Sequence, residues 1–331
     1  MYRPNGPFAS STGPALHLFD VSEPLQPVMK PFYSVDLSAY IDAILHVKFV
    51  TNPPDRPNEL WAVCSGGFAT TVSGAVVLVN LTAVATPDRA LQYSASPEVS
   101  VLATPIGEPE GVMVAPSDSS IVYIGGITSH DLGVVDVSVF EAPVLLETKR
   151  GVGMQLVGAT RKDQPSWSTE SKSTEDWDLV YMAGWGARGN LAVLNTSTAS
   201  QPILQCRTPP SQDLKLAMAN RVKLYENWAL VPLETPLGGF AVVDINSAAV
   251  SNKNSTVSAA VSQVISVHVP AKETKASTDG GIVNAKAYCL AISKSRHIYL
   301  FIAETAAVYV YCLDDVLKEA GISESSGGCV A

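Results

Sequence analysis

The stretch LGVVDVSVFEAP, residues 132–143, is a short apolar run that ends in aspartate and opens into a polar turn marked by proline. Five other segments share the pattern with varying quality: LHLFDVSEP, VVLVNLTAV, LAVLNTSTA, FAVVDINSA and VYVYCLDDV. The aligned residues are Asp20, Asn80, Asp136, Asn195, Asp244 and Asp314, which lie 60, 56, 59, 49 and 70 residues apart. A period of this length indicates a chain built from repeated structural units.

Each interval holds further strand-like runs bounded by Gly, Pro, Asn or Asp, the punctuation expected of consecutive hairpins. The sequence predicts four complete four-stranded units, with strands at 44–50, 60–64, 74–81 and 98–103; 111–115, 121–125, 133–137 and 144–149; 153–159, 179–184, 190–195 and 203–207; 214–224, 228–233, 240–245 and 262–269. A four-stranded unit of this size is typical of a β-propeller blade. We therefore predict an all-β fold, a β-propeller of about six blade-like units, with five to seven units fitting the spacing.

Both ends of the repeat are incomplete in the sequence. Residues 15–36 supply only a third and a fourth strand, and residues 283–313 supply a first, second and third. The ring could close by joining strands from both termini into one blade, or six units could leave an imperfect seam. The start of the chain could also be truncated. A short helix is expected near the C-terminus, capped by Asp314 or Asp315 and ending at Gly321.

The composition favours one domain, residues 1–331, with sheets buried on both faces. Third strands such as Val76–Val79 are apolar at every position, whereas a sheet with one wet face would alternate apolar and polar residues. The 47% hydrophobic content supports such burial. Three polar insertions, at 161–177, 246–261 and 270–282, are predicted to form long, mobile loops.

Charge and hydropathy exclude two classes of partner. The formal net charge is -9 and there are no strong basic runs, so no nucleic-acid partner is expected. No run approaches the roughly 20 apolar residues that span a bilayer, which predicts a soluble body without a transmembrane segment. The opening MYRPNGPFASSTGPAL has no apolar core of the kind a signal peptide requires.

The cysteines show no spacing of chemical interest. Five are scattered along the chain without a CxxC or Cys/His pattern, so they indicate neither a disulfide framework nor a structural zinc site. Buried core residues are the expected role. The five histidines likewise share no zinc-binding spacing, and no nucleophile elbow or phosphate-binding loop is present.

The segments at 132–143 and 16–27 (LHLFDVSEPLQP) resemble the LVIVP repeat, in which an apolar strand is followed by D-V-S and prolines. This resemblance covers most of the chain through its six copies and implies a β-propeller with one copy per blade. It carries no catalytic residue, because the motif specifies a fold and not an activity. It also implies a secreted or cell-surface protein, and nothing else in the sequence indicates a compartment.

The repeated carboxylates have a structural explanation. Asp or Asn at the end of a strand accepts hydrogen bonds from nearby backbone amides and tolerates tight turns. We therefore interpret Asp20, Asp136 and Asp244 as turn-forming residues rather than as catalytic groups.

Candidate binding residues lie in loops that do not repeat, at the end of the blades where the fourth strand leads into the next blade and the second leads into the third. They are Glu108, Glu110, His130, Trp185, Arg188, Asp213 and Glu304, joined by His46 on a first strand that could face the channel. Converging carboxylates could perform acid–base work or hold calcium, although acidic residues are also common in loops because loops are wet. Trp185 and Arg188, on a glycine-rich hairpin, suit the recognition of a carboxylate, sugar or peptide.

Two functions follow from this reading of the sequence. The leading hypothesis is a non-catalytic propeller that binds a protein, a glycan or a small ligand through one loop-rich face. The alternative is a propeller-type hydrolase, lactonase or lyase that uses carboxylates of the central channel, with or without calcium. No cofactor is predicted for the first; calcium is the one ion that the acidic loops suit, and the sequence assigns no metal ligands.

Overall fold

The computed structural model describes residues 13–19, 31–53, 56–67, 74–84, 97–127, 129–152, 158–160, 178–183, 191–207, 219, 221–233, 239–245, 263–268, 287–302, 307–319 and 321. All three polar insertions expected to be long loops lie outside these residues. The chain divides into two compact units, Met1–Gly153 and Met154–Ala331, which are described separately below. The interpretation of residues 1–331 as one domain stays a prediction.

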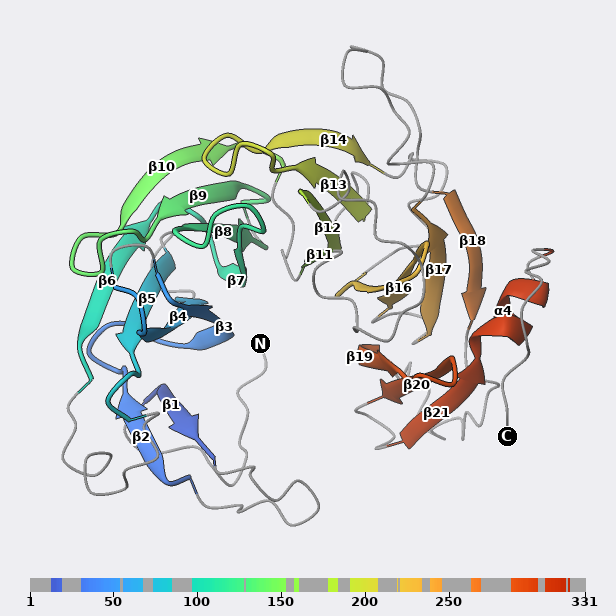
Figure 1. Ribbon diagram of the computed structural model, residues 1–331, viewed down its shortest axis with the longest axis horizontal. Coiled ribbons are helices and arrows are strands. Elements are labelled where there is room, and N and C mark those ends of the chain that lie inside the picture. The colour runs from blue at the N-terminus through green and yellow to red at the C-terminus, as the bar shows by residue number, and fades with distance from the viewer. Residues whose placement is uncertain are drawn as a thin grey trace, which may run out of the picture. The chain divides into compact units, whose positions relative to one another are not determined.

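The first unit contains three antiparallel sheets, numbered here as blades (Figure 1). Blade one pairs β1 (Ala15–Leu18) with β2 (Tyr33–Asp36). Blade two contains β3 (Ile44–Thr51), β4 (Leu60–Gly66), β5 (Gly74–Asn80) and β6 (Val99–Thr104), and blade three contains β7 (Pro109–Val114), β8 (Ile121–Gly126), β9 (Leu132–Asp136) and β10 (Val144–Lys149). In both four-stranded sheets each strand pairs with the next one in the chain.

The second unit also contains three such sheets (Figure 1). Blade four contains β11 (Ala159–Thr160), β12 (Leu179–Ala183), β13 (Leu191–Asn195) and β14 (Ile203–Arg207). Blade five contains β15 (Lys223–Tyr225), β16 (Trp228–Pro232), β17 (Phe240–Asp244) and β18 (Gln263–His268), and blade six contains β19 (Ala287–Ile292), β20 (His297–Ile302), β21 (Ala307–Cys312) and the helix α4 (Leu313–Glu319) beyond it. These up-and-down sheets, one after another along the chain, confirm an all-β propeller fold of six blade-like units with a short C-terminal helix.

Two details of the sequence prediction need correction. A continuous strand over 214–224 is wrong: β15 covers only Lys223–Tyr225, and Ala219 makes an isolated bridge to Leu233. Since Lys223 already pairs with Leu230, the inner segment carries an extra residue and the ladder is interrupted. Neither Asp314 nor Asp315 caps α4, because the helix begins at Leu313 and both aspartates lie in its first turn.

Blade two shows why its central strands are apolar at every position. In β4, Trp61 and Val63 pack into a core cluster with blade three, whereas Ala62 and Cys64 pack into a cluster with blade one. In β5, Val76 and Leu78 join the first cluster, and Val77 and Val79 join the second. The sheet is therefore buried on both faces, which removes the usual alternation of apolar and polar residues.

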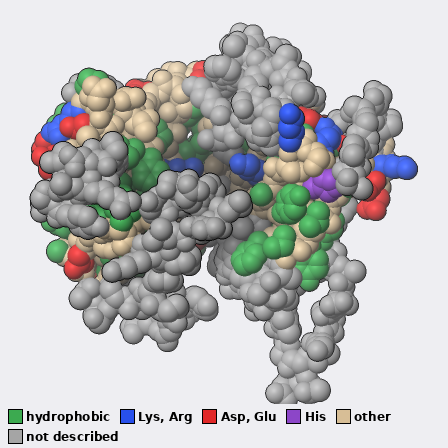
Figure 2. Space-filling view, turned by 60° about the horizontal axis from the view of Figure 1, so that its bottom comes forward, with side chains coloured by type: hydrophobic (Ala, Val, Ile, Leu, Met, Phe, Trp, Pro, Cys, Tyr) green, Lys and Arg blue, Asp and Glu red, His purple; other side chains and the backbone are tan. Residues whose placement is uncertain are grey.

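Blade five repeats this arrangement in the second unit. Ala229 and Val231 of β16 pack with blade four, and Trp228 and Leu230 pack with blade six. In blade six, Ile298 and Leu300 face this core as well. Figure 2 shows hydrophobic side chains gathered on part of the surface. In blade six, the exposed hydrophobic side chains are Tyr299, Phe301, Val308 and Val310, each between 39% and 56% exposed. One face of blade six thus differs from the sheets of blades two and five.

Candidate functional site

The structure describes four of the eight predicted binding residues, and all four lie in the first unit. His46 is on β3, Glu108 precedes β7, Glu110 is on β7 and His130 lies in the turn between β8 and β9. The other four, Trp185, Arg188, Asp213 and Glu304, lie outside the described residues. Their role in binding stays a prediction.

Glu108 and His130 belong to two loops that are bonded to each other. We call residues 105–108, 127 and 129–131 the blade-three loop end. The amide of Ile127 donates to the carbonyl of Glu108 (3.1 Å), and the amide of Gly107 donates to Ser129 Oγ (3.3 Å). A Cβ atom at Gly126 would lie 2.6 Å from the carbonyl oxygen of Gly107, so only glycine allows this approach. The two loops are held as one piece.

Both residues also have an unusual backbone conformation. Glu108 has φ of 47° and His130 has φ of 53°, in the left-handed region that side chains other than glycine seldom adopt. The amide of His130 donates to the carbonyl of Gly126 (3.1 Å), and Asp131 Oδ1 accepts from the amide of Gly151 (2.9 Å). Such conformations persist where surrounding contacts impose them, and they concentrate at ligand-binding and active sites.

Glu110 and His46 occupy the first strands of neighbouring blades. Glu110 is the extra residue of a β-bulge, since Pro109 and Gly111 pair with successive residues of β8. Strands β3 and β7 contact each other. His46 Nδ1 lies 3.1 Å from the carbonyl oxygen and 3.0 Å from the amide nitrogen of Val112. A protonated Nδ1 donates to that oxygen and a bare Nδ1 accepts from that amide, so His46 links the two blades in either state.

Three of the six repeated Asp and Asn residues form the turns that the sequence predicted, while Asp20 and the turn after Asp244 lie outside the described residues. In three blades the side-chain Oδ1 accepts a hydrogen bond from the amide two residues later: Asn80 from Thr82 (3.0 Å), Asp136 from Ser138 (2.8 Å) and Asn195 from Ser197 (3.0 Å). These are Asx turns, which fold the chain back after the third strand. Asp314 differs, because its Oδ1 accepts from Arg296 Nε at 2.8 Å.

Replacing Asp136 tests this structural role. Asp136→Ala removes the acceptor of the Ser138 amide and is expected to lower the free energy of unfolding by about 1 kcal/mol. Asp136→Asn keeps an oxygen in the same place and should unfold at nearly the wild-type urea concentration. Equal losses in the two variants would show that the negative charge, rather than the turn, is what matters.

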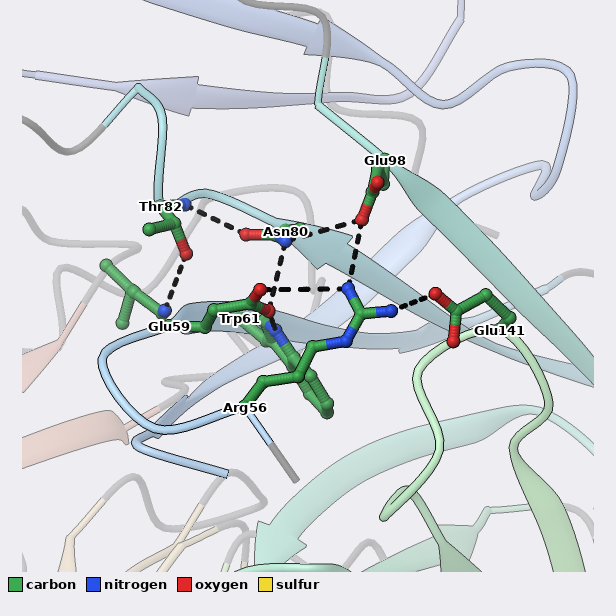
Figure 3. Close-up of polar contacts among 8 residues, drawn as sticks. Arg56, Glu59, Trp61, Asn80, Thr82, Glu98 and Glu141 are labelled. Atoms are coloured by element: carbon green, nitrogen blue, oxygen red, sulfur yellow. Dashed lines mark hydrogen bonds and ion pairs between the residues drawn. The ribbon is translucent and has the colours of Figure 1, made fainter. Parts of the chain in front are cut away.

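At the opposite end of blades two and three, an arginine joins carboxylates from three segments (Figure 3). Arg56, in the turn between β3 and β4, contacts Glu98 (3.2 Å), Glu59 (3.7 Å) and Glu141 of blade three. The guanidinium carbon also lies 5.4 Å from the centre of the Phe140 ring. Desolvation opposes the charged form of Arg56, yet the carboxylates, Glu141 foremost, hold the pKa of Arg56 above its ordinary value. We call this group the Arg56 cluster.

A second arginine has the corresponding position in blade six. Arg296, in the turn between β19 and β20, donates from Nη1 to both oxygens of Glu226 (2.7 and 2.6 Å) and from Nε to Asp314. Glu226 lies in the equivalent turn of blade five and is only 6% exposed. Burial lowers and Glu226 raises the pKa of Arg296, and the balance places it above its ordinary value. Burial and the Glu226 charge raise the pKa of Tyr225 to about 12. This is the Arg296 cluster.

Neither cluster was singled out from the sequence. Each cluster depends on one arginine shortly before the second strand of a blade, in NPPDRPNEL and in SKSRHI. This position of the arginine was the only feature of the sequence that could have indicated the clusters. In both clusters the guanidinium is already surrounded by carboxylates that hold a neighbouring segment. Both clusters therefore stabilise the packing of neighbouring blades through salt bridges. The candidate binding surface is the blade-three loop end.

In the part of the chain that the structure describes, no group of three or more His, Cys, Asp or Glu side chains is placed to hold a metal ion. Among the same residues, no helix is long and apolar enough to cross a membrane.

The cysteines differ in state. Cys64 is a free thiol buried in blade two, and burial raises its pKa to about 12. Cys312, the last residue of β21, is disulfide-bonded. The expectation that the cysteines serve only as buried core residues is thus wrong for Cys312, because a bonded pair brought together by folding leaves no regular spacing in the sequence.

Comparison with known proteins adds a resemblance of shape alone. No family model matches the chain, and no curated protein does. Among solved structures, a Lactobacillus plantarum protein is 10% identical with a TM-score of 0.49, covering 84% of this chain and 75% of its own. A Bacteroides fragilis protein provisionally named a 6-phosphogluconolactonase is 7% identical with a TM-score of 0.39, covering 86% and 82%. A chain of the mitotic checkpoint complex is 10% identical with a TM-score of 0.45, covering 87% and 81%. At these values none of the three indicates an activity for this chain.

Proposed function

We propose that this chain is a non-catalytic β-propeller, of the kind built from LVIVP repeats, that binds a protein, a glycan or a small ligand through one loop-rich face. The blade-three loop end is the observation that carries the proposal. Its two loops are bonded to each other through Glu108 and Ser129, and they present a half-buried Glu108 and an exposed His130. A surface held in one conformation before binding loses little conformational entropy when a ligand arrives.

The distribution of polar groups supports a binding protein rather than an enzyme. At the other end of the blades, the described Asx residues and both arginine clusters are committed to turns and to contacts between blades. His46, on the strand β3 that contacts the strand of Glu110, uses its Nδ1 on the Val112 backbone. Glu108 and His130 are the residues whose types and positions suit recognition of a polar ligand, because a carboxylate and an imidazole supply both acceptors and donors.

Two variants test the proposal with the full chain. Labelled protein is applied to an array of glycans and peptides, and a positive probe is then titrated by calorimetry. Glu108→Gln and His130→Asn should each raise the dissociation constant about tenfold or more, since tenfold corresponds to about 1.4 kcal/mol. Asparagine is chosen at 130 because it tolerates the left-handed conformation.

The matched control is Asp118→Asn, which removes a carboxylate at the opposite end of blade three and keeps the acceptor for the Ser120 amide. It should bind like the wild type. Affinity that survives both loop variants would contradict the proposal. Hydrolysis of a sugar lactone that Glu108→Gln abolishes would replace it with the enzyme alternative.

A further inference from the structure

Two acceptor sequences for N-linked glycans occupy the same place in different blades. The sequence NLT begins at Asn80, the last residue of β5, and NTS begins at Asn195, the last residue of β13. A third acceptor sequence, at Asn254, lies outside the described residues. An asparagine in this pattern is modified on Nδ2, with help from the hydroxyl of the Ser or Thr two residues later. The two sites therefore differ according to what these two groups already contact.

In blade two both groups are already bonded within the fold. Asn80 Nδ2 donates to Oε2 of Glu59 (3.1 Å) and to Oε2 of Glu98 (3.5 Å), both drawn in Figure 3. Thr82 Oγ1 accepts from the amide of Leu60 at 2.9 Å. A glycan replaces one of the two Nδ2 hydrogens and would occupy the place of one of the carboxylates. The fold therefore uses Asn80 as a structural residue.

In blade four the corresponding groups have no such partners. The amide of Ser197 donates to Asn195 Oδ1 at 3.0 Å, and among the described residues this is the one hydrogen bond of the Asn195 side chain. Ser197 is exposed, and Asn195 is half-buried. The residue opposite Asn195 on the outer strand β14 is Ile203, which is 67% exposed. Because opposite residues of paired strands point to the same face, Asn195 lies on an open part of blade four.

The residue beside each asparagine on the outer strand explains the difference. In blade two the amide of Asn80 donates to the carbonyl of Glu98, so a carboxylate lies next to Nδ2. In blade four the residue in this position is Ile203, which offers no acceptor in its side chain. The same turn is thus built twice, once with its amide group bonded and once with it available.

The state of Cys312 indicates the compartment in which the chain folds. Cys312 is disulfide-bonded. Disulfides persist in secreted and cell-surface proteins and form in the lumen of the endoplasmic reticulum, whereas they are rare where thiols are kept reduced. N-linked glycans are attached in that same lumen, so a chain that acquires the one modification is exposed to the other.

We propose that Asn195 carries an N-linked glycan and that Asn80, in the same motif, does not. Nδ2 of Asn195 attacks C1 of a sugar held by a lipid diphosphate. The N–C bond forms, the C–O bond to the diphosphate breaks with its electron pair, and Nδ2 loses one proton. Oδ1 takes no part, so the bond from the Ser197 amide and the turn after β13 are retained. This inference does not depend on the proposed binding function.

Peptide mapping of the secreted protein tests both parts of the proposal. The full chain is secreted from a eukaryotic host behind an added signal sequence, digested with trypsin and treated with peptide N-glycosidase in heavy-oxygen water, which converts a glycosylated asparagine to labelled aspartate. The label is expected at Asn195, in the peptide of residues 189–207, and not at Asn80, in the peptide of residues 49–89. A sample without the glycosidase corrects for spontaneous deamidation. An unlabelled Asn195 would overturn the proposal, and so would a labelled Asn80 in the folded, secreted protein.

Two variants at the blade-four site separate the glycan from the turn. Ser197→Ala removes the hydroxyl that glycan transfer requires and keeps the backbone amide that donates to Asn195 Oδ1. Asn195→Asp removes the acceptor nitrogen and keeps the turn, which Asp136 forms in blade three. In both variants the label should disappear from residues 189–207. Both should melt at the temperature of wild-type protein from which the glycan has been removed enzymatically.

The matched variant in blade two should behave differently. Asn80→Asp replaces a donor to Glu59 and Glu98 by a third carboxylate, so its melting temperature should fall below that of the wild type. Equal melting temperatures of Asn80→Asp and Asn195→Asp, each compared after removal of glycans, would contradict the difference between the two sites.

Discussion

Arg296→Ala is expected to lower the free energy of unfolding by about 3 to 5 kcal/mol, the range found when one member of a buried ion pair is removed. Arg296 bonds both oxygens of Glu226, which is 6% exposed and lies in the turn of blade five. Without the guanidinium, that carboxylate is left buried without its opposite charge. Asp314 also loses its contact, so blade five, blade six and the start of α4 are all affected.

Paired variants separate the charge from the packing of the Arg296 side chain. In Arg296→Met with Glu226→Gln, the buried carboxylate of Glu226 is replaced by a neutral amide and only Asp314 loses its contact with Arg296, so a large part of the lost stability should return. Arg150→Ala, at an exposed position, is the control and should change stability by less than about 0.5 kcal/mol. Urea unfolding followed by tryptophan fluorescence, to which Trp228 beside Tyr225 contributes, measures the change in stability. An Arg296→Ala variant as stable as the control would contradict the role of the cluster.

The repeat explains why so much of the fold was predictable from sequence. An apolar run ending in Asp or Asn records two local requirements at once, a strand buried on both faces and an Asx turn at its end. Strands β5, β9 and β13 meet both requirements with residues adjacent in sequence. Their positions could therefore be read without knowing what packs against them.

The polar contacts between blades were not predictable, because they join residues far apart in the chain. Arg56 meets Glu141 across 85 residues, His46 meets Val112 across 66, and Arg296 meets Glu226 across 70. The pairing of turns from neighbouring blades depends on how their sheets pack, and no local sequence pattern predicts that packing. The sequence did place Glu108 and His130 at one end of a blade, because loop order follows from strand order, but it held no sign of their left-handed backbone.

Trp61→Ala should have an effect as large as the loss of Arg296, by creating a cavity between blades two and three. The indole is fully buried, and its ring meets Phe140 edge-on with ring centres 5.0 Å apart. Removing a buried tryptophan side chain costs about 3 to 5 kcal/mol, since the surrounding side chains fill the space only in part. The Arg56 cluster should loosen with it, because Trp61 Nε1 donates to Glu59 Oε2 at 2.6 Å.

Trp61→Phe separates the two contributions of the tryptophan to stability, which are the packing of its ring and the hydrogen bond from its Nε1. Phenylalanine keeps most of the ring packing against Phe140 and lacks the donor, while Asn80 Nδ2 still donates to Glu59 Oε2 at 3.1 Å. One lost hydrogen bond to a charged acceptor is worth about 1.5 to 3 kcal/mol, so Trp61→Phe should recover part of the stability that Trp61→Ala loses.

Hydrogen exchange shows which strands lose stability when Trp61 is replaced by alanine. In Trp61→Ala, peptides from β4, β5 and β8 should exchange faster than in the wild type, because their side chains line the cavity. Peptides from β16 and β17, which belong to the other compact unit, should keep their protection. Faster exchange at equal rates in both sets would mean that the two units unfold together, and the core between blades two and three would then stabilise the whole chain rather than its own unit.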